Sequence, residues 1–116
     1  MYAAGDCCST KQFTHNSDIQ ARTVLYNALL FSSIDATKIQ LPWCTYTDPE
    51  IATVGSTEQE LKASKTKYTT YTKDYAKLDR AICDSQKGFM KILTKAGTSE
   101  ILGATFVGGP AGDMIS

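Results

Sequence analysis

The first 41 residues carry one stretch of helical periodicity. Apolar side chains recur there at three- and four-residue intervals, at Ala21, Val24, Leu25, Ala28 and Phe31. Ser17 and Gln20 have capping-box spacing at the start of this pattern, which predicts a helix that ends near residues 31–33. The small residues at 2–6 stop at Gly5-Asp6 and predict the end of a buried strand. Polar residues 32–40 predict a linker that closes at Leu41-Pro42.

Beyond Pro42 the pattern favours strands. Residues 43–54 are rich in Thr, Tyr, Ile and Val and predict one extended strand, interrupted at Asp48-Pro49 and ended by Gly55. Thr57 and Glu60 form a second capping box, which predicts a short helix to about Lys65 with Leu61 facing inward.

The rest of the chain predicts a sheet with one hairpin. Three strands are expected at residues 68–73, 80–83 and 89–93. A turn at residues 96–98 returns the chain into a strand at 101–107, so the last two strands form a hairpin. Residues 108–112 break that strand, and residues 113–116 predict the first turn of a helix.

Charge and hydropathy exclude several classes of partner. Twelve basic residues balance twelve acidic ones, so no net field favours nucleic acid or an anionic membrane. Tyr68, Tyr71 and Tyr75 alternate with lysines, as in single-strand binders, but Asp74 and Asp79 lie among them, and we expect no nucleic-acid partner. No apolar run approaches the ~20 residues that span a bilayer, and the N-terminus lacks signal-peptide regions. We therefore expect a cytoplasmic setting and no membrane partner.

Four cysteines are present, at positions 7, 8, 44 and 83. Their spacing is irregular, and the adjacent Cys7 and Cys8 cannot easily close an unstrained bridge with each other. Reduced, mostly structural thiols are expected. A soft-metal or thiol-binding site at Cys7 and Cys8 stays open as an alternative.

Two motifs stand in a fixed order. Residues 42–61 read PWCTYTDPEIATVGSTEQEL, and residues 2–6 read YAAGD upstream of them. The first resembles the opening of the interface domain of the flavin-dependent pyridine nucleotide-disulfide oxidoreductases. Within this family it is most similar to the mercuric-reductase-like members. The second resembles the strand end at which that family binds FAD. The resemblance implies an α+β fold: residues 42–116 form most of an interface (dimerisation) domain, an antiparallel sheet with helices packed on one face, and residues 1–41 are a remnant of an FAD-binding domain.

The resemblance also implies site residues. Gly5 and Asp6 correspond to the turn whose carboxylate meets the ribityl chain of FAD, and Phe13-Thr14-His15 resembles the segment that brings a helix N-terminus to the flavin. Thr14, His15 and Asn16 are therefore candidate flavin contacts, because the positive end of a helix dipole stabilises a reduced flavin's charge. His15 is not assigned as a base, since the family's base belongs to a later His-Glu segment.

Several elements of the family's chemistry are absent from this sequence. It has no C-x-x-x-x-C dithiol and no G-x-G-x-x-G turn for a dinucleotide, and Gly108 to Gly112 lies between strand and helix with the wrong spacing. We expect a fragment that forms a homodimer, with FAD belonging to the full-length relatives and no catalysis alone. A stand-alone dimerisation or binding module is the alternative.

Overall fold

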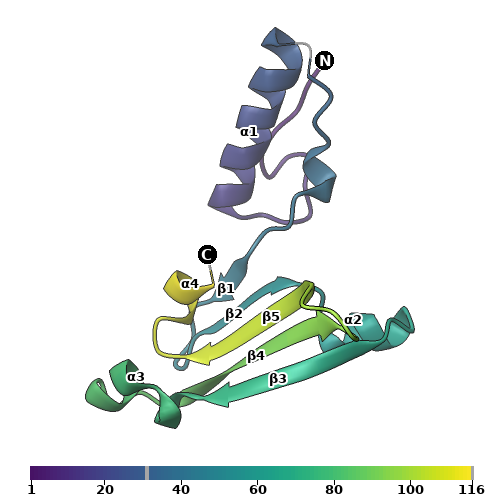
Figure 1. The fold of residues 1–116 in the computed structure, drawn as a ribbon. Helices are drawn as coiled ribbons and strands as arrows, with labels where there is room; N and C mark the ends of the chain where they lie inside the picture. The colour runs from purple at the N-terminus through teal and green to yellow at the C-terminus, as the bar shows by residue number, and fades with distance from the viewer. Residues whose placement is uncertain (31, 116) are drawn as a thin grey trace. The chain divides into compact units, whose positions relative to one another are not determined.

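The structure is a computed structural model that describes residues 1–30 and 32–115 (Figure 1). The chain divides into two compact units, Met1–Leu41 and Pro42–Ser116. Two predictions fall partly or wholly outside these ranges. They are Phe31 as an apolar helix position and the last residue of the helical turn at 113–116.

The first unit contains one long helix, α1 (Thr14–Leu29), and a short 3₁₀ turn, η1 (Ala36–Lys38). The predicted capping box at Ser17 is wrong, because α1 begins three residues earlier with Phe13 at the N-cap position. Ser17 lies within the helix, where its hydroxyl lies 3.4 Å from the Phe13 carbonyl oxygen. A hydroxyl in this position bonds the preceding turn of the helix and does not cap it.

The predicted strand end at residues 2–6 is also wrong. Residues 1–4 have no regular structure, Gly5 begins a turn, and Tyr2 is 58% exposed. A strand forms only when neighbouring strands take up its backbone hydrogen bonds. The described part of the first unit contains no strand that could do so.

The second unit is a five-stranded antiparallel sheet, which confirms the predicted α+β class (Figure 1). Its strand order is β1-β2-β5-β4-β3, and every neighbouring pair is antiparallel. The strands are β1 (Trp43–Thr45), β2 (Ile51–Gly55), β3 (Tyr68–Asp74), β4 (Gly88–Lys95) and β5 (Ile101–Gly108). The predicted hairpin around residues 96–98 joins β4 to β5 and is confirmed.

Residues 43–54 fold back on themselves and do not form the single interrupted strand that we predict. Trp43 pairs with Thr53 and Thr45 with Ile51, so β1 and β2 are a hairpin. Thr47 makes the turn, since its N–H donates to the Thr45 carbonyl over 2.9 Å and its hydroxyl donates to the Pro49 carbonyl over 2.7 Å.

The predicted strand at residues 80–83 is a helix, α3 (Asp79–Cys83). Asp74 ends β3 by accepting the Ala76 N–H, which starts the 3₁₀ turn η2 (Tyr75–Lys77). Arg80 then pairs with Asp84 at 2.7 Å, one helical turn away. These local side-chain bonds favour helix where the apolar pattern alone suggests a strand.

Two short helices begin close to their predicted positions. In α2 (Glu58–Ala63) both bonds of the predicted Thr57–Glu60 capping box are present, and Leu61 is buried. Helix α4 (Ala111–Met114) starts two residues before the predicted position. Both helices follow a strand that ends at a glycine with positive φ, Gly55 or Gly108, a conformation that other residues adopt only with strain.

The register of the sheet assigns its side chains to two faces. On one face, here called the Lys91 face, Lys91 lies beside Thr105 and Thr53. Glu58 of α2 reaches Lys91, so α2 covers this face. On the other, called the Ile92 face, two apolar rows cross the sheet: Val54, Ala104 and Ile92, then Ala52, Phe106 and Met90.

Candidate functional site

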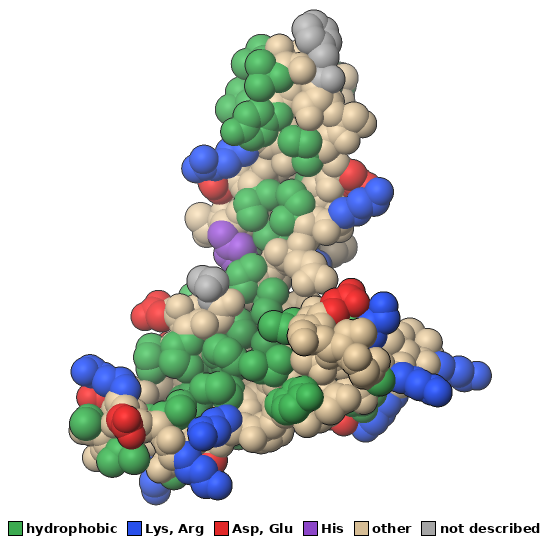
Figure 2. All heavy atoms as spheres, in the orientation of Figure 1, with side chains coloured by type: hydrophobic (Ala, Val, Ile, Leu, Met, Phe, Trp, Pro, Cys, Tyr) green, Lys and Arg blue, Asp and Glu red, His purple; other side chains and the backbone are tan. Residues whose placement is uncertain are grey.

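The Ile92 face is an apolar surface that the second unit covers only in part. Helix α4 lies against β1, β2 and β5, and Ala52 and Ala111 are fully buried there. The other members of the two rows are only half-buried. Figure 2 shows hydrophobic side chains gathered over the sheet unit. Soluble monomers rarely leave a large contiguous apolar area open, so this face is a candidate association surface.

One carboxylate holds α4 to the β1–β2 hairpin. Glu50 Oε2 accepts the Gly112 N–H over 3.0 Å and lies 3.9 Å from Cys44 Sγ. Desolvation, followed by the neighbouring negative charge of Glu50, raises the pKa of the Cys44 thiol. Cys44 is therefore a protonated packing group and not a reactive thiolate.

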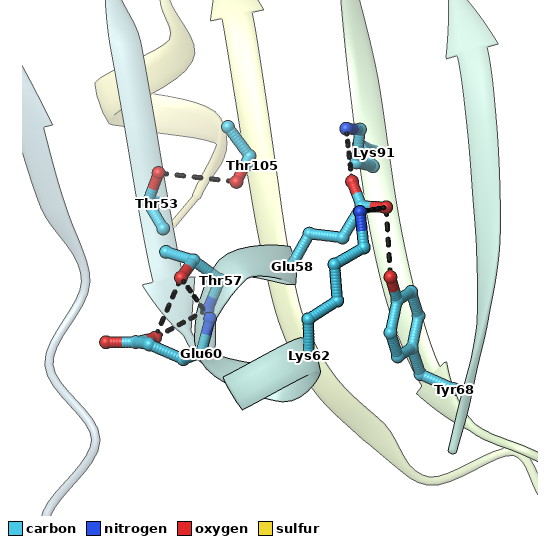
Figure 3. Close-up of polar contacts among 8 residues, drawn as sticks. All are labelled: Thr53, Thr57, Glu58, Glu60, Lys62, Tyr68, Lys91 and Thr105. Carbon is cyan, nitrogen blue, oxygen red and sulfur yellow. Dashed lines mark hydrogen bonds and ion pairs between the residues drawn. The ribbon is translucent and has the colours of Figure 1, made fainter. Parts of the chain in front are cut away.

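A second carboxylate joins α2 to the Lys91 face (Figure 3). Glu58 accepts hydrogen bonds from the Tyr68 hydroxyl at 3.0 Å and from Lys91 Nζ at 3.1 Å, and Lys62 Nζ lies 3.3 Å away. These partners, Lys91 first, lower the pKa of Glu58 to about 2. The pKa of Tyr68 is raised by desolvation and by its bond to Glu58. The group is a structural clamp between helix and sheet.

In the first unit, Gly5 and Asp6 lie beside the first turns of α1. The Gly5 N–H donates to Gln20 Oε1 over 2.7 Å, and Ser17 Oγ lies 3.4 Å from Asp6 Oδ1. Asp6 is exposed. The structure thus brings Gly5 and Asp6 together with the start of the helix that carries Thr14, His15 and Asn16.

The three helix residues differ in surroundings. Thr14 and His15 are exposed, and the His15 ring stacks on Phe13 with 5.5 Å between ring centroids. Asn16 is only 4% exposed, and its amide nitrogen donates to Ser9 Oγ at 3.0 Å and to the Lys11 carbonyl at 2.6 Å. The Asn16 side chain therefore holds the loop before α1.

The remaining side of α1 is apolar and exposed. The large exposed side chains are Leu25, Tyr26 and Leu29 of α1 and its C-cap residue Leu30, and Figure 2 shows hydrophobic side chains along the helix. Of the predicted apolar face, Ala21, Leu25 and Ala28 are exposed and Val24 is half-buried. The helix buries Asn16 and Thr23 instead. The apolar pattern thus marks a side of α1 that the first unit does not cover.

Sequence reasoning did not identify several of the residues that organise these sites. Gln20, Glu50 and Glu58 each bond groups distant in the sequence, over 15, 62 and 33 positions respectively. A single polar residue carries no periodic signal of its long-range partner. Of the three, only Glu58 has a local signal, because it is the first residue of the helix that the Thr57 capping box predicts.

Two absences apply to residues 1–30 and 32–115. No helix there is long and apolar enough to cross a membrane. No group of three or more His, Cys, Asp or Glu side chains in these ranges is placed to hold a metal ion. Cys7, Cys8, Cys44 and Cys83 are all free thiols, and only Cys44 is not exposed.

Comparisons with known proteins agree on one family. The sequence profile of the pyridine nucleotide-disulphide oxidoreductase dimerisation domain matches residues 41–116. The chain is 33% identical to a dihydrolipoyl dehydrogenase of Mycoplasma pneumoniae, covering all of this chain and 26% of that protein. It is 28% identical to a mercuric reductase of Shewanella putrefaciens, covering 99% of this chain and 21% of the relative.

Solved structures give the same result. LpdA of Mycobacterium tuberculosis superposes with a TM-score of 0.87 at 27% identity, covering 98% of this chain and 25% of LpdA. The flavoprotein disulfide reductase RclA of Escherichia coli superposes with a TM-score of 0.86 at 25% identity, covering 97% and 26%. The chain thus spans about a quarter of the length of the proteins it matches. It belongs to the pyridine nucleotide-disulphide oxidoreductase family, of which it carries the dimerisation domain.

Proposed function

We propose that this chain supplies the subunit interface and one part of the flavin site of an FAD-dependent pyridine nucleotide-disulfide oxidoreductase, and that alone it associates as a homodimer without catalysis. The observation that carries the proposal is the family match over residues 41–116, together with the half-covered Ile92 face of the same residues. Residues 1–41 are then part of the FAD-binding domain.

The residues of the first unit fit one section of FAD. Asp6 offers an exposed carboxylate to ribityl hydroxyls, and the Gly5–Gln20 bond fixes the turn that carries it. The adjacent N-terminus of α1 offers positive dipole charge, since Phe13 has no polar side chain to cap it. Bound FAD would supply hydride and electron transfer, while these residues bind and orient it.

The same residues do not fit the whole cofactor. The sequence contains no G-x-G-x-x-G turn to cradle a pyrophosphate, and it contains no C-x-x-x-x-C dithiol to take electrons from a flavin. We infer that this chain binds FAD too weakly to retain it, and that its own activity is association.

The experiment is light scattering on the purified 116-residue chain, with visible absorbance recorded across the same peak. A colourless dimer supports the proposal. A colourless monomer at high micromolar concentration would contradict the association role, and a yellow peak would contradict the claim that the chain does not retain flavin.

The second candidate is an independent dimerisation module, which is favoured by the complete five-stranded sheet within residues 42–116. Residues 42–116 prepared alone distinguish the two. An independent module dimerises with the same affinity as the full chain, whereas an oxidoreductase piece that also uses the exposed side of α1 dimerises more weakly when residues 1–41 are removed.

A further inference from the structure

The turn after Gly5 brings two adjacent thiols to the surface of the first unit. The Cys8 N–H donates to the Gly5 carbonyl over 3.1 Å and closes a turn over residues 5–8. Cys7 Sγ lies 3.4 Å from the Ala4 carbonyl oxygen, and Cys8 Sγ lies 3.3 Å from that of Gly5. Both cysteines are free and exposed. The two side chains are accessible to a reagent from solution.

The two thiols also interact with each other. The pKa of Cys8 is raised, first by desolvation and then by the charge of Cys7 and a side-chain hydrogen bond with Cys7. The two cysteines are adjacent in the sequence, and their thiols lie against the neighbouring carbonyl oxygens of Ala4 and Gly5. The pair is therefore a candidate dithiol.

Gln20 fixes this dithiol against α1. Its Oε1 accepts the Gly5 N–H at 2.7 Å and lies 3.4 Å from Cys8 Sγ. Because one helical side chain holds both ends of the turn, less conformational freedom is lost when a ligand joins the thiols.

A cavity of about 310 Å³ opens beside Cys8. The loop residue Lys11, Asn16 and Gln20 of α1, and Ala36 of η1 contribute to its lining. A small organic group attached to a ligand on Cys8 could enter this space. All of these residues belong to the first unit.

The chemistry of adjacent thiols restricts the ligand. A disulfide between neighbouring residues is strained, and a tetrahedral zinc site needs further ligands that the described residues do not offer. A two-coordinate mercury ion takes sulfurs on opposite sides, whereas pyramidal trivalent arsenic takes two neighbouring sulfurs on the same side and keeps one organic substituent.

We propose that Cys7 and Cys8 form a binding site for trivalent organoarsenicals, with the organic group in the cavity beside Cys8. The reaction of an arsine oxide with both thiols forms two As–S bonds. The oxygen of the arsine oxide leaves as water with both thiol protons, and no atom changes its oxidation state. The site shares the turn at residues 5–8 and Gln20 with the proposed flavin contacts. Binding of an arsenical requires neither flavin nor association of two chains.

The probe is phenylarsine oxide, added to the reduced 116-residue chain and followed by intact mass spectrometry. We expect one phenylarsenic group per chain, retained in excess glutathione and released by 2,3-dimercaptopropanol. Trypsin cleaves after Lys11, so the adduct should lie on a peptide of residues 1–11, which contains both thiols. Release by glutathione, or an adduct elsewhere, would overturn the proposal.

Matched variants separate this site from ordinary thiol reactivity. Cys7→Ser and Cys8→Ser should each lose the glutathione-resistant adduct, while the double variant Cys44→Ser/Cys83→Ser should keep it. Serine can donate to the same carbonyl oxygens, and circular dichroism checks that α1 is retained. An adduct that survives in the Cys7→Ser variant contradicts the dithiol.

The role of the cavity has its own control. We expect the wild-type chain to retain the phenyl compound several-fold longer than the methyl analogue during exchange with a dithiol. Ala36→Phe should narrow the cavity and remove that preference while leaving chelation intact. Equal retention of both compounds by the wild-type chain would contradict the placement of the organic group.

Discussion

The two units of the chain differ in how they pair their backbone hydrogen-bonding groups and in how far they bury their apolar side chains. The second unit has a five-stranded ladder, in which β5 pairs on both sides and side chains such as Leu93 are buried. The first unit has one helix whose leucines at 25, 29 and 30 are exposed, and it has no strand among its described residues. The second unit pairs its strands within itself and covers part of its apolar surface, whereas the first leaves large apolar side chains of its helix exposed.

The comparison teaches how to interpret an apolar pattern in a chain that spans a quarter of its relatives. In the sheet unit, the apolar side chains of Ala52 and Leu93 are buried by residues of the same unit. In α1 the same kind of pattern marks a surface that stays exposed at Leu29. Periodicity shows which side of a helix or strand is apolar, but it does not show which part of the protein packs against that side.

The largest expected difference between the two units is the cost of truncating a leucine. Leu93 is 3% exposed and Leu29 is 68% exposed. Leu93→Ala should lower the free energy of unfolding by about 2–5 kcal/mol, because it removes buried methyl groups and leaves a cavity. Leu29→Ala should change it by less than about 0.5 kcal/mol. Urea unfolding measures both costs, with Trp43 fluorescence reporting on the second unit and far-ultraviolet circular dichroism reporting on α1. Equal costs would contradict the contrast between the units.

The next difference concerns two motifs of the same form. Thr57 caps α2 in the structure, whereas Ser17 lies inside α1. Thr57→Ala should cost about 1 kcal/mol of stability, the usual value of a lost N-cap. The free energy of unfolding of Ser17→Ala should lie within about 0.5 kcal/mol of the wild-type value. Thermal unfolding of the two variants side by side gives the comparison, and a larger loss for Ser17→Ala would mean that the motif at Ser17 acts as a cap.

A smaller effect depends on pH and arises in the second unit. The pKa of Glu58 is lowered from 4.5 to about 2. A lowered pKa in the folded state adds stability above pH 4.5, and this contribution is lost as the pH falls from 4.5 toward 2. Glu58→Gln should therefore lower the urea midpoint at pH 6 and flatten its decline below pH 4.5.

The matched control for Glu58 is Glu100, which pairs with Lys95 at 3.3 Å on an exposed turn. Glu100→Gln should leave the acid dependence of the urea midpoint unchanged, because exposed pairs contribute little. If both variants give the same pH profile, the clamp between α2 and the sheet contributes nothing specific.

The parts of the fold that the sequence predicts are those with local signals. The capping box at Thr57, the turn at residues 96–98 and the α+β class of residues 42–116 are confirmed. The failures lie where the determining partner is absent or irregular. The strand predicted at residues 2–6 has no partner strand among the described residues of the first unit. Helix α3 follows from the side-chain bonds of Asp74 and Asp84, which leave no apolar pattern in the sequence.

The candidate site was less accessible to prediction than the fold. A motif predicts Gly5 and Asp6 as site residues, whereas the sequence pattern indicates Gln20, which bonds Gly5, only as half of a capping box. Asn16 was predicted as a flavin contact, and its side chain bonds Ser9 and Lys11. Side-chain partners that close loops follow from tertiary placement and leave no spacing pattern in the chain.

Native-state hydrogen exchange on the intact chain tests whether the sheet of residues 42–116 is more stable than the helix of residues 1–41. We predict that amides of β4 and β5 exchange only on global unfolding, while amides of α1 exchange through local opening at a clearly lower free energy. Equal protection of α1 (Thr14–Leu29) and β5 (Ile101–Gly108) would contradict the claim.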